Sequence, residues 1–268
     1  MKGGGFVRAG DSKRVALTVA GSDSGGGAGI QADLKTFRAF GVFGTSAVTC
    51  ITAQNPDRIT AMEVIDAHIV GEQMECVFAA FRIGGAKTGM LYGAEIIEAV
   101  AAVLRKHACK SLVVDPVMTA SSGAPLLKKN AVAALKTKLL PRAIVVTPNL
   151  AEAEILSQRT IRTAAELRES ARALADQFGV AFLVKGGHLP QAKRAVDVLF
   201  DGRTLHEFSA PVVPNIKTHG TGCTLSAAIA ANLALGHGLV ESVERAKEFV
   251  TQAIRGAIRI GRYRALKI

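Results

Sequence analysis

The glycine-rich stretch at residues 217–226 carries the side chains best suited to chemistry. It reads Lys-Thr-His-Gly-Thr-Gly-Cys-Thr-Leu-Ser. Gly220 and Gly222 allow backbone N–H groups to approach an anion closely, and the helix expected after them adds the positive end of its dipole. Cys223 stands at the start of that helix, where the pKa of a thiol tends to fall. An isolated cysteine in such a place is more often buried and unreactive, but the flanking glycines favour a reactive thiol here.

A first glycine-rich loop, at residues 21–29, reads Gly-Ser-Asp-Ser-Gly-Gly-Gly-Ala-Gly. It lacks the Lys and Ser/Thr that follow the last glycine of a Walker A loop. Residues 27–32 fit a loose G-x-G-x-x-A dinucleotide pattern, but residues 45–54 contain no acid where that pattern requires one. A dinucleotide site is therefore disfavoured, and a purely structural glycine turn is a competing interpretation.

Polar residues near the ends of three expected strands are candidates for binding a metal ion or phosphate. Asp115 ends one strand, and Asn149 and Glu152 would share a face in the first turn of a helix. Carboxylate, amide and water oxygens suit Mg²⁺, although Glu152 has a second interpretation as an ordinary first-turn acid. Lys185, beside two glycines, is either a phosphate ligand or a solvated lysine.

Apolar periodicity places these residues on alternating strands and helices. Strands are expected at residues 15–20, 47–53, 111–114, 143–147 and 180–184, with a hairpin at 195–200 and 204–209. Helices are expected at residues 30–40, 68–81, 94–107, 130–140, 164–178, 222–235 and 240–260. The alternation predicts one α/β domain at residues 15–268, with a mostly parallel sheet between helices, after a flexible leader at residues 1–14. Ligands of such sheets lie at the carboxyl ends of the strands.

Composition narrows the classes of partner. The 268 residues include 33 basic and 22 acidic ones, a net charge of +11, and much of this excess lies in residues 1–14 and 241–268. Neither segment contains a nucleic-acid-binding motif, so no nucleic-acid partner is expected. The four cysteines form no C-x-x-C pair or zinc spacing, which indicates a reduced, cytoplasmic protein. Residues 218–240 contain no Lys, Arg, Asp or Glu, but their glycine loop favours a buried helix over a membrane span.

Several short motifs occur in an order typical of one enzyme family. They are residues 19–37 (opening Val-Ala-Gly-Ser-Asp-Ser), 52–55 (Thr-Ala-Gln-Asn), 87–91 (Lys-Thr-Gly-Met-Leu), 114–118 (Val-Asp-Pro-Val-Met), 147–153 (Thr-Pro-Asn-Leu-Ala-Glu-Ala), 185–188 (Lys-Gly-Gly-His) and 219–226. On these motifs, from about residue 14 to the end of the chain, the sequence resembles the hydroxymethylpyrimidine/phosphomethylpyrimidine kinases of thiamine biosynthesis. These enzymes belong to the ribokinase-like superfamily, so the resemblance implies a three-layer α/β/α sandwich with a mostly parallel central sheet.

The resemblance also implies a reaction. Kinases of this family use ATP and Mg²⁺ to phosphorylate the hydroxymethyl group of 4-amino-5-hydroxymethyl-2-methylpyrimidine, and then convert the monophosphate to the diphosphate. Pyridoxal or pyridoxine kinase is the main alternative, because it shares the fold, the glycine loop and the cysteine. A nucleotide-binding regulatory module is a non-enzymatic alternative, which the intact Gly220–Cys223 loop disfavours. The family is typically homodimeric, so a homodimer is expected.

Carried over by motif, the resemblance assigns residues to the substrate and to the transferred phosphate. The pyrimidine pocket would contain Gly21, Asp33, Gln54, Met90 and Val117. An anion hole would be formed by Gly220, Thr221 and Gly222, with Cys223 in the position of the general base. Most ribokinase-like sugar kinases have Asp at that position, and Cys is typical of the pyrimidine branch and of some vitamin B6 kinases.

The resemblance assigns the remaining candidates to ATP and the metal. Lys185, Asn149 and Thr221 would contact ATP phosphates, and Asp115 and Glu152 would hold Mg²⁺. One departure from the family pattern is Thr88, where an apolar residue is common. It lies outside the residues assigned to the chemistry.

Overall fold

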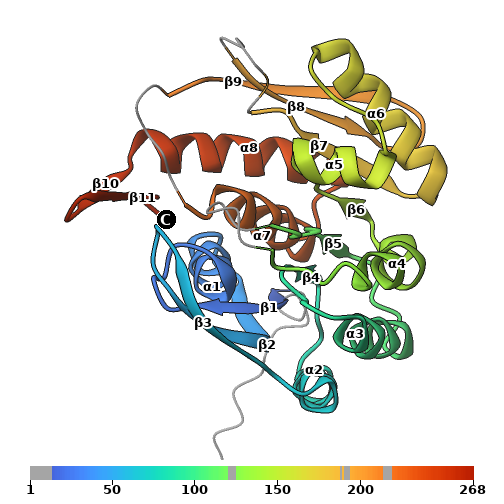
Figure 1. The fold of residues 1–268 in the computed structure, drawn as a ribbon, viewed down its shortest axis with the longest axis vertical. Coiled ribbons are helices and arrows are strands. Elements are labelled where there is room, and N and C mark those ends of the chain that lie inside the picture. Colours follow the sequence, from blue (N-terminus) through green and yellow to red (C-terminus); the bar gives the residue numbers. More distant parts are fainter. Residues whose placement is uncertain (1–13, 120–124, 188, 190–193, 214–218) are drawn as a thin grey trace, which may run out of the picture.

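The structure is a computed structural model that describes residues 14–119, 125–187, 189, 194–213 and 219–268. The strands of its main sheet are β1 Val15–Asp23, β2 Phe43–Gln54, β3 Ile59–Val64, β4 Gly85–Thr88, β5 Leu112–Val114, β6 Val145–Val146, β7 Ala181–Lys185, β8 Arg194–Phe200 and β9 Leu205–Pro211. They form one nine-stranded sheet in the order β3-β2-β1-β4-β5-β6-β7-β8-β9 (Figure 1). The central pairs from β2 to β7 are parallel, whereas β2–β3, β7–β8 and β8–β9 are antiparallel.

Helices cover both faces of this sheet. They are α1 Gly29–Ala39, α2 Ala67–Ala80, α3 Ala94–Lys106, α4 Ala131–Ala134, α5 Leu150–Ser157, α6 Ala164–Phe178, α7 Thr221–Ala234 and α8 Leu239–Arg255. One layer consists of α1, α7 and α8, and the opposite layer contains α2 to α6 (Figure 1). The predicted three-layer sandwich with a mostly parallel sheet is therefore confirmed.

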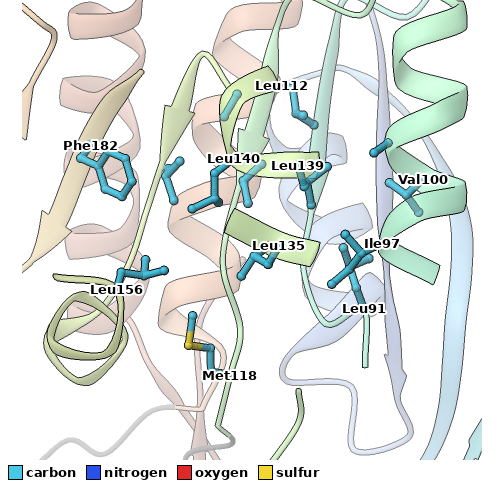
Figure 2. Packing of buried hydrophobic residues seen from close by; sticks show 14 of the residues in the cluster. Leu91, Ile97, Val100, Leu112, Met118, Leu135, Leu139, Leu140, Leu156 and Phe182 are labelled. Atoms are coloured by element: carbon cyan, nitrogen blue, oxygen red, sulfur yellow. The ribbon is translucent and has the colours of Figure 1, made fainter. Parts of the chain in front are cut away.

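Alternate side chains of the central strands enter two separate cores. In β5, Leu112 and Val114 pack on the α2–α6 side, whereas Val113 packs against the layer that holds α7. In β7, Phe182 and Leu183 divide in the same way. Strands buried on both faces need continuous apolar runs, which explains why these segments show no polar alternation. Figure 2 shows the core between the sheet and the α2–α6 layer. There Leu135, Leu139 and Leu140, which follow α4, pack beside residues of the strands.

Two predicted helices differ from the structure. The helix predicted at residues 240–260 ends at Arg255, and a small hairpin follows, β10 Ile258–Ile260 and β11 Tyr263–Ala265. Gly256 caps α8, and the alternating Ile-Arg-Ile that follows suits a strand. The helix predicted at residues 130–140 is α-helical only in α4. After α4 the chain forms a π-helical turn, Leu135–Leu139, and then a 3₁₀ turn, Leu140–Arg142. Pro141 lies in this last turn, and because proline has no N–H, the α-helical hydrogen bonding cannot continue through it.

The strands β3 and β4 were not predicted, and neither was the β10–β11 hairpin. The helix whose first turn would hold Asn149 and Glu152 is α5. The predicted leader, residues 1–14, lies outside the described residues except for Arg14, whose carbonyl accepts a hydrogen bond from the Phe43 N–H. The uncharged stretch does contain a buried helix, since α7 is fully buried from Thr224 to Ala234. In the described part of the chain, no helix has the length and apolar character needed to cross a membrane.

Candidate active site

The glycine-rich stretch that begins in the structure at His219, here called the second glycine loop, leads directly into α7. It packs against the first glycine loop, residues 21–29. Gly220 is the N-cap of α7 and has a φ of 85°, a conformation that side chains disfavour. A Cβ at Gly220 would lie 1.8 Å from the carbonyl oxygen of Gly27, so only glycine fits this contact. The first N–H groups of an α-helix have no acceptor within the helix and point out of its end. The predicted anion hole therefore stands at the N-terminal end of α7, held in place by the first loop.

A buried ion pair lies beside this loop, at the carboxyl ends of β5 and β7. Asp115 accepts a hydrogen bond of 2.9 Å from Nζ of Lys185, and its other oxygen accepts one of 3.2 Å from Ser226 of α7. A Cβ at Gly222 would lie 3.3 Å from the same Nζ, so the glycine leaves room for the ammonium next to the loop. The structure thus brings together Gly222, Lys185 and Asp115, which the resemblance had assigned to the anion hole, to the ATP phosphates and to Mg²⁺, respectively.

The charges of this pair stabilise each other. Burial works to raise the pKa of Asp115, but the ammonium groups of Lys185 and Lys87 outweigh it and hold the pKa below its ordinary value. Burial works to lower the pKa of Lys185, but the carboxylates of Asp115 and Glu152 outweigh it and raise that pKa. Both groups are therefore charged at neutral pH. Lys185, with 14% of its side chain exposed, is not the solvated lysine of the competing interpretation.

Glu152 has the structural role that its sequence position suggested. Its Oε2 accepts from the Asn149 N–H at 2.8 Å, and the Asn149 side chain accepts from the Glu152 N–H, which forms a capping box at α5. Its Oε1 accepts from the Met118 N–H at 3.3 Å. Burial raises the pKa of Glu152, and the charge of nearby Lys185 only partly offsets this. Glu152 is thus a buried cap that also faces the Asp115–Lys185 pair. Its metal role stays a prediction, and no cluster of three or more His, Cys, Asp or Glu suited to a metal occurs among the described residues.

Three of the predicted pocket residues meet around Cys50. Met90 and Cys50 are buried in one apolar cluster, with their sulfur atoms 3.6 Å apart, and Val117 packs against it. A Cβ at Gly21 would lie 2.7 Å from Sγ of Cys50 and 3.3 Å from Sδ of Met90. Gly21 is therefore required by close packing, and these side chains form a compact apolar surface where β1, β2 and β4 end.

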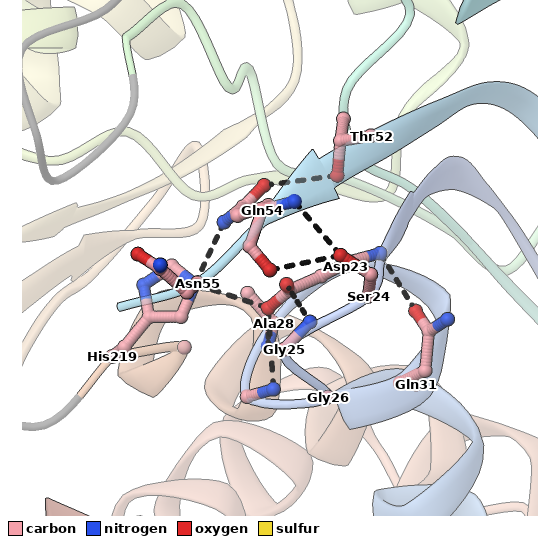
Figure 3. Close-up of polar contacts among 12 residues, drawn as sticks. Asp23, Ser24, Gly25, Gly26, Ala28, Gln31, Thr52, Gln54, Asn55 and His219 are labelled. Carbon is pink, nitrogen blue, oxygen red and sulfur yellow. Dashed lines mark hydrogen bonds and ion pairs between the residues drawn. The ribbon is translucent and has the colours of Figure 1, made fainter. Parts of the chain in front are cut away.

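Gln54, at the end of β2, lies between the two glycine loops (Figure 3). Its Nε2 is 3.0 Å from Nε2 of His219, and that ring nitrogen is also 3.1 Å from Oδ2 of Asp23. Its Oε1 accepts a hydrogen bond from Thr52. His219 directly precedes the second loop, so it connects the predicted pyrimidine-binding residue to both loops. Sequence reasoning gave His219 no role.

The first glycine loop binds a carboxylate of its own chain. Asp23 accepts hydrogen bonds from the N–H groups of Gly25, Gly27 and Ala28, at 2.8 to 3.2 Å (Figure 3). Burial works to raise the pKa of Asp23, but the hydrogen bonds from His219 and from these amides outweigh it and lower the pKa. These amides are already satisfied by Asp23, which favours the structural-turn interpretation of this loop.

Asp33 is fully buried and does not open onto the pocket in this structure. Its carboxylate is 2.8 and 3.1 Å from Nζ of Lys87, which is also fully buried, and it accepts from the Thr18 hydroxyl at 2.6 Å. The contact with a pyrimidine predicted for Asp33 stays a prediction. Lys87 is a second residue that sequence reasoning missed, although a lysine in the otherwise small and apolar strand β4 is a signal that could have drawn attention to it.

Cys223 differs from the expectation in one respect. We predicted that the helix start would lower the pKa of its thiol, and this is wrong. Burial raises the pKa to about 11, although the nearby Lys87 ammonium and a hydrogen bond from the Gly29 N–H act to lower it. Loss of hydration at the sulfur outweighs the favourable charges. The thiol is therefore mostly protonated at neutral pH, and the exposed Cys76 is expected to react with alkylating agents first.

In sequence and in fold, the chain is similar to pyrimidine kinases and to pyridoxal kinases. A hydroxymethylpyrimidine/phosphomethylpyrimidine kinase of Rhizobium meliloti is 51% identical over 247 residues, which cover 92% of each chain. The ADP complex of a Bacillus subtilis pyridoxal kinase superposes with a TM-score of 0.88 at 37% identity, covering 95% of this chain and 97% of that chain. A phosphomethylpyrimidine kinase structure from Clostridium difficile gives a TM-score of 0.79 at 40% identity, covering 90% of this chain and 99% of that chain.

The family assignment rests on nearly the whole chain. Residues 23–266 match the sequence model of the family described as phosphomethylpyrimidine kinase. This range contains both strands of the Asp115–Lys185 pair, the second glycine loop and Gln54. The chain belongs to the phosphomethylpyrimidine kinase family.

Proposed function

We propose that this chain transfers the γ-phosphoryl group of ATP to 4-amino-5-hydroxymethyl-2-methylpyrimidine, and then phosphorylates the monophosphate to the diphosphate in thiamine biosynthesis. The observation that carries the proposal is the position of the second glycine loop beside the Asp115–Lys185 pair, where a Cβ added at Gly222 would lie 3.3 Å from Nζ of Lys185. Helix N-terminal amides beside a buried ammonium stabilise the charge of a transferred phosphoryl group. The 51% identity to a kinase named for these substrates supports the choice of pyrimidine.

In the first transfer, the hydroxymethyl oxygen attacks the γ-phosphorus, and the bond between that phosphorus and the bridging oxygen of ADP breaks. The hydroxyl proton passes to the Cys223 sulfur in the enzyme form that holds it as a thiolate, because a protonated thiol cannot accept it. Since the pKa of Cys223 is about 11, this form is a small fraction of the enzyme at neutral pH. The proton leaves as the attack proceeds, while the amides of Gly220, Thr221 and Gly222 stabilise the developing charge.

Gln54 is the residue that would distinguish the pyrimidine by hydrogen bonding. Its amide offers a donor and an acceptor, and the amino group and ring nitrogen of the substrate present the complementary pair. Gly21, Met90 and Val117 would supply the apolar contact to the ring. Asp33 would act from behind this surface through Lys87, since its carboxylate is fully buried.

The carboxylates near the loop suit a hydrated Mg²⁺. An ionised carboxylate has about four acceptor sites, and the hydrogen bonds from Thr147, Lys185 and Ser226 leave capacity on Asp115. Glu152 likewise accepts from two backbone N–H groups and retains capacity. Mg²⁺ usually keeps several waters, so we propose that Asp115 and Glu152 hold it through water. When bound, Mg²⁺ would neutralise charge on the ATP phosphates, which Lys185, Asn149 and Thr221 would contact.

Pyridoxal kinase activity is the second candidate. The superposition on the Bacillus subtilis pyridoxal kinase, with a TM-score of 0.88, favours it specifically. Pyridoxal also carries a hydroxymethyl group on an aromatic ring, so the anion hole and Cys223 would act on it in the same way. The two activities therefore differ only in the ring that the pocket accepts.

An ATP-consumption assay with the hydroxymethylpyrimidine, its monophosphate and pyridoxal tests the proposal. We expect turnover with both pyrimidines and a kcat/KM for pyridoxal at least about tenfold lower, a typical discrimination between related rings. Turnover with pyridoxal alone would support the second candidate. No ATP consumption with any of the three would contradict both.

We further propose that the enzyme acts in the cytoplasm as a homodimer. Phe43 and Ile51 on β2 and Ile69 on α2 are exposed apolar side chains, of the kind that a dimer interface covers. Sedimentation of the purified protein tests the dimer: a monomer at micromolar concentration would contradict it. Fractionation of the source cells tests the compartment.

A further inference from the structure

The side-chain amide of Gln54 has two possible orientations, because a half-turn exchanges its oxygen and its nitrogen. In the first, drawn in Figure 3, Oε1 lies 3.1 Å from the Thr52 hydroxyl and Nε2 lies 3.0 Å from Nε2 of His219. In the second, the NH₂ group faces Thr52 and the oxygen faces His219. The backbone of Gln54 is fixed in both, because the Ser24 hydroxyl binds its N–H and its carbonyl, each at 2.8 Å. The hydrogens on Thr52 and His219 therefore decide which orientation is stable.

Thr52 favours the second orientation. A hydroxyl has one hydrogen to donate. Its Oγ1 lies 2.7 Å from the carbonyl oxygen of Ser22, which can only accept, and 3.1 Å from the nearest atom of the Gln54 amide. The shorter contact uses the hydrogen, so the hydroxyl oxygen presents a lone pair to the amide. The NH₂ group of Gln54 can donate to that lone pair, whereas the amide oxygen would be repelled by it.

Asp23 determines which nitrogen of the His219 ring carries a hydrogen. Oδ2 of Asp23 lies 3.1 Å from Nε2 of His219. Burial works to raise the pKa of Asp23, but hydrogen bonds from His219 and the loop amides outweigh it, so Asp23 is an ionised carboxylate that can only accept. Nε2 must then supply the hydrogen. A hydrogen on Nδ1 instead would be buried without an acceptor in the described part of the chain. Both observations select the Nε2–H form of the ring.

The ring of His219 is held in place by the two glycine loops. A Cβ at Gly27 would lie 3.1 Å from Cδ2 of the ring, and a Cβ at Gly220, the next residue, would lie 1.8 Å from the carbonyl oxygen of Gly27. The Nε2–H is thus fixed between Asp23 and Gln54. An NH₂ group of Gln54 in that place would set two donors against each other, whereas the amide oxygen can share the hydrogen with Asp23.

We propose that His219 is a positioning residue that orients Gln54. Its Nε2–H, held by Asp23, keeps the amide oxygen on the side of the second glycine loop and the NH₂ group on the side of Thr52. This orientation follows from contacts within the protein. Its consequence for the substrate rests on the proposed function, in which Gln54 binds the pyrimidine.

The orientation of Gln54 would determine how the pyrimidine enters the site. The substrate carries its amino group on C4, between the ring nitrogen N3 and C5, which bears the hydroxymethyl group. In a bidentate pair with Gln54, the amino group donates to Oε1 and N3 accepts from the NH₂ group. C5 then lies on the Oε1 side of the pair, which is the side of His219 and Gly220. With the amide reversed, the hydroxymethyl group would lie on the side of Thr52.

The hydrogen on His219 can be measured without ATP or pyrimidine. A long-range ¹H–¹⁵N correlation spectrum of the protein with ¹⁵N-labelled histidine, at neutral pH, reports which ring nitrogen carries a hydrogen. The signals of His219 are those that disappear in His219→Gln or His219→Leu. We expect Nε2 to carry a hydrogen. An Nε2 without one would overturn the proposal, whether or not the protein phosphorylates the pyrimidine.

A substrate analogue tests the orientation of the amide. The 4-oxo analogue of the hydroxymethylpyrimidine has a carbonyl in place of the amino group and a hydrogen on N3, so it requires the reversed amide. In wild type, that reversal would set the NH₂ group of Gln54 against the Nε2–H of His219. We therefore expect kcat/KM for the 4-amino substrate to exceed that for the analogue by roughly 10⁴.

Two variants of His219 separate orientation from a structural role. His219→Leu removes the N–H and lets the amide reverse, so the preference for the 4-amino substrate should fall at least about tenfold while its KM rises about tenfold. His219→Gln can place an N–H near the position of Nε2, and should return that KM to within about threefold of wild type. His237→Leu, beyond the C-terminal end of α7, is the control and should change neither value.

An unchanged preference in His219→Leu, with activity toward both compounds lowered equally, would overturn the proposal, because a purely structural role affects both alike. If wild type phosphorylates neither compound, the proposed function fails. The state of Nε2 in the spectrum then decides by itself whether His219 orients Gln54.

Discussion

The two glycine-rich loops have similar compositions but different surroundings. In the first, the N–H groups of Gly25, Gly27 and Ala28 bind the carboxylate of Asp23, so the anion is part of the chain. In the second, Gly220 and Gly222 lead into α7 beside the ammonium of Lys185. The difference teaches that composition alone does not make a glycine loop a site for a ligand anion, because a side chain of the protein can bind its amides.

The second loop should carry the largest effect on catalysis. We expect Cys223→Ala to lower kcat by roughly 10² to 10⁴, the usual contribution of a general base, while the protein still folds and binds ATP. Single-turnover rates at saturating ATP measure this loss. Cys76→Ser, at an exposed position, is the matched control and should keep wild-type rates. Near wild-type turnover in Cys223→Ala would show that the anion hole and metal suffice without a base.

Gln54, between the loops, should affect substrate binding and little else. Gln54→Ala removes a bidentate contact, so the KM for the pyrimidine should rise by a factor equivalent to about 1–3 kcal/mol, with ATP binding near normal. Gln31→Ala is the control, because Gln31 also contacts the first loop, through Asp23 and Ser22, and is not among the residues that the resemblance assigns to the pyrimidine pocket. If both variants raised the pyrimidine KM equally, Gln54 would be a structural residue of the loop.

The first loop should affect stability. Asp23→Asn replaces a charged acceptor of several N–H groups, and we expect the free energy of unfolding to fall by about 2 kcal/mol at neutral pH. Because the folded-state pKa of Asp23 is lowered from 3.8, its contribution is present above that value and is lost as the pH falls through the depressed pKa. Urea unfolding at a series of pH values measures this. The difference between wild type and variant should shrink as the pH falls below 3.8 and through the lowered pKa of Asp23.

A control for this prediction is Asp57→Asn. Asp57 is an exposed acid that binds Arg262 and Tyr263, and its loss should leave the melting temperature near wild type. A difference between wild type and Asp23→Asn that stays constant from neutral to acid pH would mean that the charge of Asp23 does not hold the first loop.

Glu152 should have the smallest effect. In Glu152→Gln the side chain keeps an oxygen for the Asn149 N–H, but its new NH₂ group faces the Met118 N–H. We expect a loss of roughly 1 kcal/mol of stability, weaker apparent Mg²⁺ affinity and a lower kcat. A titration of activity with Mg²⁺, alongside thermal melting, separates the two roles. A drop in melting temperature with normal Mg²⁺ dependence would leave Glu152 as a helix cap only.

Much of the fold was predictable because apolar periodicity and glycine punctuation mark buried strands and amphipathic helices. The short strand β4, Gly-Ala-Lys-Thr, was not, because its Lys87 and Thr88 look polar in the sequence, and the burial of Lys87 depends on Asp33, a partner that the fold brings to it. The edge strand β3 is mostly exposed and carries no strong pattern. Local sequence does not show which residues from distant parts of the chain will contact a polar side chain and allow its burial.

The candidate site shows the same limit. The order of motifs was sufficient to predict that Asp115, Lys185 and the second glycine loop meet, because strand ends and helix starts converge at one edge of the sheet. The charge state of Cys223 was not predictable, since it depends on burial by distant segments and on Lys87. The bridge from His219 to Gln54 and Asp23 likewise joins residues that are far apart in the sequence.

The measurement that tests the comparison most directly is amide NMR of the ¹⁵N-labelled protein during titration with AMP-PCP, a non-hydrolysable ATP analogue, and Mg²⁺. We predict that the amide signals of Gly222 and Cys223 shift strongly, while those of Gly25 and Gly27, which bind Asp23, shift much less. Larger shifts at Gly25 and Gly27 than at Gly222 would contradict it, because the phosphates would then lie on the first loop.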